Sequence, residues 1–380
     1  MKKLIKITAA ALAAGMTVTL AGCSGCACCS GNARNLTVIN SNWYSDTTFG
    51  GIQQSFILSD EHPEYTKEEI QYSVTFDGTN SSNTSYSVEY KDGNFVTEFY
   101  ATQYDWNAEN IPSNYRSAKP ETVYCYKTVL TISVKYTLKG GASSDWFDDS
   151  VETLCYFRSA KDNLQPVYSK QVLKTTSPAE NKADSLDKAY KRVDVTYENF
   201  YNKNCVEITS VTTEAGKQPE TKVYGGLNKL KTSLFDNSSL YVALRGMKFS
   251  TTSAHSINLF SPAAGGISTY TAYSGINTLG AEERKSISAA LEKKELYVPV
   301  TKDADGNDVE DAGVKYNALS VAYTGGPLSG SAQTVWYAAV ENADNNTSRA
   351  TMLKMSVPLS FGLGTLNYVL EEVNFTLWNK

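Results

Sequence analysis

The chain has 380 residues, a formal charge of −5 at neutral pH, a hydrophobic content of 41% and 25 tyrosines. A net negative charge disfavours binding to nucleic acids, which carry negatively charged phosphates. It also argues against a basic patch that would bind an anionic membrane surface. A chain of this length can bury one large core or two smaller ones. We therefore expect a globular protein with no nucleic-acid partner.

The first 22 residues have the order of a secretion signal. Three lysines within the first six residues form a basic head, and Ile7 to Leu20 is a fourteen-residue apolar run. That length suits the core of a signal peptide and is short for a membrane span. The sequence Leu20-Ala21-Gly22-Cys23 then resembles the lipobox of bacterial lipoproteins.

The lipobox resemblance implies cleavage before Cys23 and a diacylglyceryl thioether on its sulfur. The protein would then be anchored by lipid to the bacterial cell membrane, facing outside the cytoplasm, so the membrane itself is a partner. An uncleaved N-terminal helix is the alternative.

More cysteines follow in a Gly- and Ser-rich segment, residues 23–36. Cys26 and Cys29 have CxxC spacing, which can hold zinc or form a redox pair. A closed zinc site needs four ligands, and with the Cys23 sulfur acylated the sequence offers neither a second CxxC nor a pair of histidines to complete one. We interpret Cys26, Cys28 and Cys29 as part of a flexible membrane-proximal tether and predict no metal and no cofactor.

The chain beyond the tether has the composition of β-strands, with abundant Tyr, Thr, Val and Ser. Apolar and polar residues alternate in YSVTFD (72–77) and in SYSVEY (85–90). The segment between them, GTNSSNT, is rich in residues that favour turns. This pattern predicts a β-hairpin.

The most regular alternation runs from Val123 to Leu138. Its even positions are tyrosine, threonine or aliphatic, including Leu130, Ile132 and Val134, while its odd positions are mainly Lys, Thr and Ser. Sixteen alternating residues exceed the usual strand of about five or six. A strand this long must twist or curve strongly, as in a barrel or part of one.

Further strands are predicted along the remaining chain, whereas helix is scarce. The predicted strands are 151–158, 192–198, 206–211, 296–301, 314–323, 334–340, 351–359 and 366–378. One short helix should begin after Asp236, which can cap it, and place Leu240, Leu244 and Met247 on one face. A second is expected within 280–295, and the polar segment 175–187 is interpreted as a loop.

Cys125, Cys155 and Cys205 lie in strand-like runs beside apolar residues. Free cysteine is commonly buried as a small apolar side chain, so we interpret all three as core residues. One disulfide among them is the alternative.

No catalytic pattern is present in the sequence: it has no GxSxG, no HExxH and no phosphate-binding loop. The acid-rich segment 144–152 is interpreted as a solvated turn rather than a glycosidase pair. Residues 303–311 favour a hairpin tip over a calcium loop, and His255 favours a turn or surface position. We therefore predict no catalytic residues and a protein that is not an enzyme.

Three stretches carry a resemblance to a known group. They are DNLQPVYSK (162–170), LFDNSSLYVALRGM (234–247), and TVWYAAV (334–340) with the segment that follows it to the C-terminus. Together they resemble an uncharacterised group of bacterial envelope proteins with a highly curved antiparallel sheet, similar to the half-barrel of LolA-like lipoprotein carriers. The resemblance covers residues 145–380. It implies an open barrel whose concave face takes an acyl chain or is plugged by a helix, for which residues 236–247 are the natural candidate.

We therefore predict a mainly β fold: a strongly curved antiparallel sheet, open or half-barrel, with one or two short helices. A closed sandwich is the alternative. The predicted parts are a signal peptide (1–22), the tether (23–36) and a β body (37–380), which leaves open an N-terminal β subdomain (37–145).

The predicted function is that of a non-catalytic envelope lipoprotein that binds an apolar, lipid-like ligand or another envelope protein or component. A cell-surface glycan-binding or adhesion module is the alternative, because many tyrosines and five tryptophans offer stacking surfaces.

Overall fold

The computed structural model describes residues 65–79, 84–117, 119–158, 164–230, 234–244, 254–277, 287, 318–324, 333–337 and 352–377. The signal peptide, Cys23, the tether and the segment 303–311 lie outside these residues. In the part of the chain that is described, no helix is long and apolar enough to cross a membrane.

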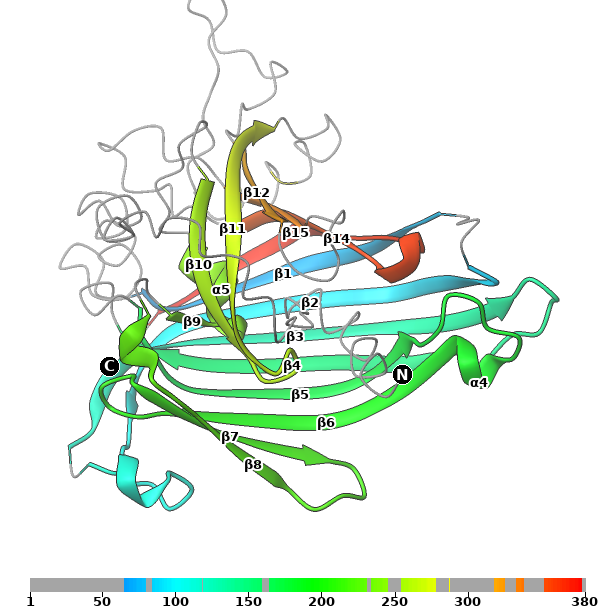
Figure 1. The fold of residues 1–380 in the computed structure, drawn as a ribbon. Coiled ribbons are helices and arrows are strands. Elements are labelled where there is room, and N and C mark those ends of the chain that lie inside the picture. The colour runs from blue at the N-terminus through cyan, green and yellow to red at the C-terminus, as the bar shows by residue number, and fades with distance from the viewer. Residues whose placement is uncertain are drawn as a thin grey trace, which may run out of the picture.

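An eleven-stranded antiparallel sheet dominates the molecule. Its strands in chain order are β1 (Tyr65–Gly78), β2 (Tyr86–Tyr104), β3 (Glu121–Leu138), β4 (Phe147–Phe157), β5 (Pro166–Pro178), β6 (Tyr190–Tyr201), β7 (Glu207–Glu214), β8 (Glu220–Gly225), β13 (Thr334–Tyr337), β14 (Met352–Pro358) and β15 (Gly364–Leu377). Their order in space is β13-β14-β15-β1-β2-β3-β4-β5-β6-β7-β8. The sheet is strongly curved (Figure 1), and in the described part of the chain its two end strands, β13 and β8, do not pair with each other, which confirms the predicted mainly β, open antiparallel fold.

A smaller layer covers the concave face of the large sheet (Figure 1). It is a four-stranded sheet in the order β12-β11-β10-β9, with β9 (Leu234–Asp236), β10 (Ala254–Ser261), β11 (Gly266–Asn277) and β12 (Ala318–Thr324). The short helices η5 (Asn237–Ser239) and α5 (Leu240–Leu244) continue directly from β9. β9 and η5 contact β5, and η5 also contacts β4, so this covering layer fills the hollow of the large sheet.

Other helical turns are short and lie in the connections. They are η2 (Ser113–Tyr115), α4 (Leu186–Ala189), η4 (Leu227–Lys229) and η6 (Ser360–Gly362).

The alternation of β3 decides which side chains face the covering layer. From Tyr124 to Tyr136 every even-numbered residue is buried, whereas Thr131 between them is exposed. A strand presents successive side chains to opposite faces, so the even residues share the concave face. The predicted strand and its orientation are therefore confirmed.

Aromatic side chains make up much of the core between the two layers. The ring centroids of Tyr72 and Phe95 lie 5.5 Å apart, and those of Phe95 and Tyr368 lie 5.4 Å apart. From the covering layer, Phe235 and Leu240 join the same buried cluster. Burying a side chain of this size contributes roughly 1.5–3 kcal/mol, so the packing of Phe235 and Leu240 against this cluster holds the covering layer in place.

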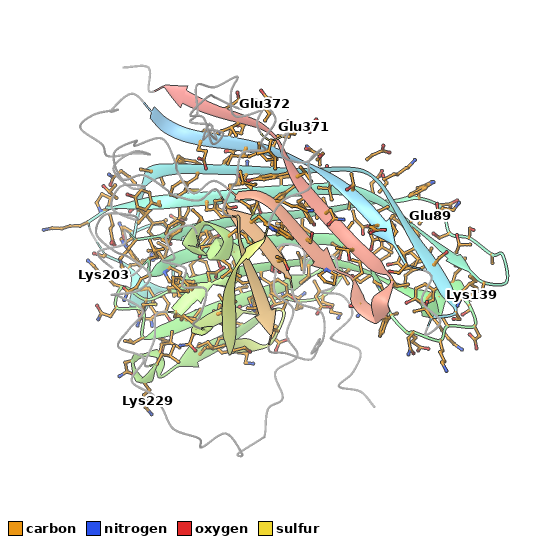
Figure 2. All side chains as sticks on the ribbon, turned by 90° about the horizontal axis from the view of Figure 1, so that it is seen from above. Glu89, Lys139, Lys203, Lys229, Glu371 and Glu372 are labelled. Carbon is orange, nitrogen blue, oxygen red and sulfur yellow. The ribbon has the colours of Figure 1, made fainter. Side chains whose placement is uncertain are left out.

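Irregular pairings accompany the curvature of the sheet. In β2 the register with β3 shifts between Lys91 and Asn94, where Asp92 has a φ of 52°. In β15 the register with β1 passes from Glu372 to Leu370, so Glu371 is an extra residue. A bulge of this kind bends its strand, and Glu371 and Glu372 lie together at the rim of the sheet (Figure 2).

Part of the opposite face of the large sheet is covered by the connection between β2 and β3. Ile111 and Tyr115 pack against Tyr168 and Phe200, which point away from the concave face. Near the end of this connection Arg158 donates to the Glu121 carboxylate, with 2.6 Å between Nε and Oε1. This connection was not predicted as a folded element.

Several sequence interpretations need correction. Residues 175–178 belong to β5 and are buried, so the predicted loop 175–187 begins too early. His255 lies in β10, opposite Ala272, so the turn alternative is wrong, while the surface alternative stays a prediction. The strands β5, β8, β9, β10 and β11 were not predicted, and the predicted strand 296–301 lies outside the described residues. Of the expected helix within 280–295, only Ile287 is described, and it is helical and buried.

The three cysteines of the β body carry free thiols, so they form no disulfide. Cys125 and Cys155 are fully buried, which confirms their interpretation as core residues. Cys205 is only partly buried and lies in the turn between β6 and β7 with a φ of 53°, so its assignment to a strand is wrong.

Candidate functional site

A cavity of about 610 Å³ lies between β6, β7 and β8 and the turn that joins β10 to β11. Val195 and Tyr197 of β6 and Thr212 of β7 form part of its wall, and Pro262 and Gly265 of the turn lie across from them. Pockets for small molecules commonly enclose about 300–1,000 Å³. The cavity is therefore large enough for a ligand of several rings.

Charged side chains of both signs line this cavity. The cations are Lys174, Lys191, Arg192 and Lys222, and the acids are Asp148, Asp194, Glu214 and Glu220. The rings of Tyr197 and Tyr224 add two aromatic surfaces to the wall. The lining is thus polar, unlike the apolar core beside it.

Strand pairing explains why the concave face becomes polar here. One row across β5 to β8 consists of Ser169, Asn199, Ser210 and Lys222, each directly opposite the next. In β4 the same row continues with Cys155, which is fully buried in the apolar core. The polar side chains therefore lie on the same face of the sheet as the core residues, but on the four strands at one end of it, β5 to β8.

A chain of buried hydrogen bonds leads from the cavity into the protein. Ser210 Oγ donates to Asn199 Oδ1 at 2.7 Å, and Asn199 Nδ2 donates to Ser169 Oγ at 2.8 Å. The Ser169 and Tyr201 hydroxyls both donate to Oδ2 of Asp236, each at 2.5 Å. Ser210 lines the cavity, whereas Asp236 belongs to β9, so the chain links the cavity wall to the covering layer.

Asp236 has two roles, of which the sequence indicated one. Its Oδ1 accepts from the Ser238 backbone N–H at 2.7 Å, which confirms the predicted helix cap. Its Oδ2 joins the covering layer to β5 and β6. Burial raises the pKa of Asp236, and the hydrogen bonds from Ser169, Tyr201 and Ser238 oppose that rise.

A second buried carboxyl, Asp149, follows the cavity residue Asp148 in β4. Its oxygens accept from the Thr176 backbone N–H at 2.6 Å and from the Thr176 hydroxyl at 2.8 Å. Burial raises the pKa of Asp149 to about 7, although these hydrogen bonds and the charge of Arg192 act in the opposite direction. The interpretation of residues 144–152 as a solvated turn is therefore wrong for Asp149, which is only 2% exposed in β4.

The acid cluster of residues 144–152 does not bring two carboxyls together on one face. Asp148 pairs with Ser133, and its Oδ1 accepts from the Ser133 hydroxyl at 3.0 Å. Asp149 follows it directly in β4, so the two side chains point to opposite faces of the sheet. Asp148 and Asp149 are therefore not arranged as a facing pair for glycoside hydrolysis.

The side chains that line the cavity can contact a polar ligand. The described lining supplies hydroxyls, charges and ring faces. Within the described residues, no group of three or more His, Cys, Asp or Glu is placed to hold a metal ion. Burial raises the pKa of the Cys155 thiol well above its usual range, which makes it a poor nucleophile at neutral pH.

Comparisons with known proteins add little to this site. No protein-family model and no curated protein matches the chain. Among solved structures, it is similar to a beta-barrel-like protein of a domain of unknown function, DUF1849, from Brucella abortus. The sequence identity is 10% and the TM-score is 0.41, over 83% of this chain and 100% of that one. The description of that protein names neither a ligand nor an activity.

Proposed function

We propose that this protein is a non-catalytic, membrane-anchored envelope lipoprotein that binds a polar, saccharide-like ligand. The observation that carries the proposal is the polar cavity of about 610 Å³ beside β6 to β8. Sugars need hydrogen-bond partners for their hydroxyls and an aromatic surface for their carbon–hydrogen faces. Ser210, Thr212, Tyr197 and Tyr224 offer both in one wall. The geometry thus favours the glycan-binding alternative that the sequence left open.

An apolar ligand is a second candidate, and it is favoured by the apolar concave face of β1 to β4. That face is covered by the protein's own side chains, among them Phe235, Leu240 and Leu259, each at most 1% exposed. A lipid-like ligand would therefore have to displace the covering layer. The cavity beside β6 to β8 needs no such rearrangement.

The cavity can be tested without knowing the ligand, by filling it. Thr212 is half-buried in the cavity wall, so Thr212→Trp should block the cavity and weaken the binding of any ligand there at least tenfold. Thr213→Trp, on the exposed opposite side of β7, is the matched control and should bind normally. Binding is measured on a glycan array with the detergent-extracted full chain. Equal binding by both variants would exclude the cavity as the site.

The lipid anchor is tested separately, because Cys23 lies outside the described residues. Cys23→Ala should yield an unprocessed precursor that incorporates no labelled fatty acid. Normal acyl labelling of this variant would show that the lipobox interpretation is wrong. Changing Cys26, Cys28 and Cys29 together to serine should leave both the label and the melting temperature unchanged.

A further inference from the structure

We infer that the ligand of this cavity is an acidic saccharide, whose carboxylate is held by Arg192 together with the lysines beside it. This inference rests on the proposed function and adds the charge class of the ligand. Three observations support it: which charged groups of the cavity form ion pairs, which of them contact aromatic rings, and which acids remain unpaired.

The pairing of the charges leaves the cations available. Lys174, Lys191, Arg192 and Lys222 make no ion pair within the described part of the chain. Two of the four acids already have partners, because Glu214 pairs with Lys217 and Asp148 accepts from Ser133. With Glu214 neutralised by Lys217, the lining has four unpaired cations and three unpaired acids, Asp148 among them, so its balance is slightly positive.

Aromatic rings contact two of these cations, and Asp149 interacts with Arg192 through its charge without forming an ion pair. The guanidinium of Arg192 lies 4.9 Å from the ring centroid of Phe147, and the ammonium of Lys222 lies 4.7 Å from that of Tyr224. A ring attracts a cation without neutralising its charge. Both groups thus have a ring contact, and their donors make no hydrogen bond to a described residue. A planar guanidinium can bind a carboxylate through two parallel hydrogen bonds.

The remaining acids indicate what else the ligand carries. Asp194 and Glu220 line the same cavity and make no ion pair among the described residues. They would repel a densely charged polyanion, but they accept hydrogen bonds from hydroxyl groups. A ligand with one carboxylate per unit and several hydroxyls satisfies both sets of side chains. A uronic-acid saccharide has this composition, whereas inorganic phosphate lacks enough donors.

The experiment uses a panel of oligosaccharides, each supplied as the uronic acid and as its methyl ester, with inorganic phosphate as a third probe. Binding to the detergent-extracted full chain is measured by isothermal titration calorimetry. We expect the acid to bind at least tenfold more tightly than its ester, and added salt to reduce that difference.

Two variants assign the effect to the cavity. Arg192→Gln should weaken the binding of the uronic acid at least tenfold and leave the binding of its methyl ester unchanged. Lys229→Gln removes the same charge from an exposed residue at the periphery of the molecule (Figure 2), outside the cavity lining, and should change neither. If Arg192→Gln lowers the melting temperature, Lys191→Gln replaces it, because Lys191 is exposed and makes no ion pair with a described residue.

The outcomes separate the two proposals. Equal binding of acid and ester, blocked by Thr212→Trp, overturns the acidic ligand and leaves the saccharide site intact. Binding of phosphate in place of any saccharide overturns the assignment of a sugar. Absence of binding to every member of the panel overturns the proposed function and this inference with it.

Discussion

The concave face has two halves: one lies under the covering layer, and the other forms the polar cavity beside β6 to β8. Both show the same alternation of side chains, but only the first is buried in the apolar core. A single row of directly opposed residues runs Leu130, Val151, Leu173, Val195 and then Glu214, from β3 to β7. The first four are at most 3% exposed, whereas Glu214 is exposed and paired with Lys217. The row leaves the core where the covering layer ends. The alternation therefore selects which side chains face inward, and the covering layer determines which of them are buried.

Asp236 lies near the border between these two halves. Its carboxylate, from the covering layer, accepts hydrogen bonds from hydroxyls of β5 and β6. A polar contact thus replaces apolar packing where the side chains of the concave face change from apolar to polar. We therefore expect substitutions to lower the free energy of unfolding most in the covered half, less at this border and least in the cavity.

The largest effect is expected in the covered half. Ile132 is 3% exposed on the concave face, so Ile132→Asp both removes apolar packing and buries a charge. It should lower the free energy of unfolding by about 5 kcal/mol. Thr131→Asp, on the exposed face one residue away, should cost less than about 0.5 kcal/mol. Urea unfolding of both variants is the measurement, and equal costs would contradict the assignment of faces.

Asp149 should make stability depend on pH. Its pKa is about 7 in the folded chain and near the ordinary 3.8 in the unfolded chain, so the folded state binds the proton more tightly. The free energy of unfolding therefore falls as the pH rises from about 4 to about 7, by up to roughly 4 kcal/mol from this group. Asp236 contributes in the same direction, because burial raises its pKa too.

Comparison with Asp149→Asn isolates the contribution of Asp149. Chemical unfolding at about pH 5 and about pH 8 should show a smaller difference for this variant than for the wild type. A difference that is unchanged in the variant would mean that Asp149 titrates normally in the folded protein.

At the border, Asp236→Ala leaves the hydroxyls of Ser169 and Tyr201 without their acceptor and also removes the helix cap. We expect a loss of about 3 kcal/mol in the free energy of unfolding. Asp194→Ala, which removes an exposed acid from the cavity, is the control and should cost less than about 0.5 kcal/mol. Increased binding of an apolar dye by Asp236→Ala alone would show that the covering layer has loosened. A loss as small as that of the control would refute the role of Asp236 between the layers.

The smallest effect is expected inside the cavity. Lys222→Gln removes only the contact of an exposed ammonium with the Tyr224 ring, so it should change the free energy of unfolding by no more than about 0.5 kcal/mol. Thermal unfolding monitored by circular dichroism is sufficient to measure it. A cost of several kcal/mol would place Lys222 in the core and remove the contrast between the two halves.

The regular strands were predictable because their alternation is local. The run from Val123 to Leu138 indicated a long, curved strand and its buried face, and the structure confirms both. β8 gave no such signal, because its residues, ETKVYG, lie at a sheet edge and are mostly exposed. The polar end of β5, including the buried Thr175 and Thr176, resembled a loop for the same reason: composition alone does not reveal burial.

The sequence by itself determined the strand-rich fold, the inward face of β3 and the capping role of Asp236, because each depends on neighbours a few residues apart. Only the tertiary structure decided the site. The cavity forms where β6 to β8 meet the turn after β10, and Asp236 meets Ser169 from 67 residues away in the chain. No local pattern encodes such meetings, because they depend on which strands pair and on where the covering layer ends. The same polar alternation can therefore form a solvated face or a binding site.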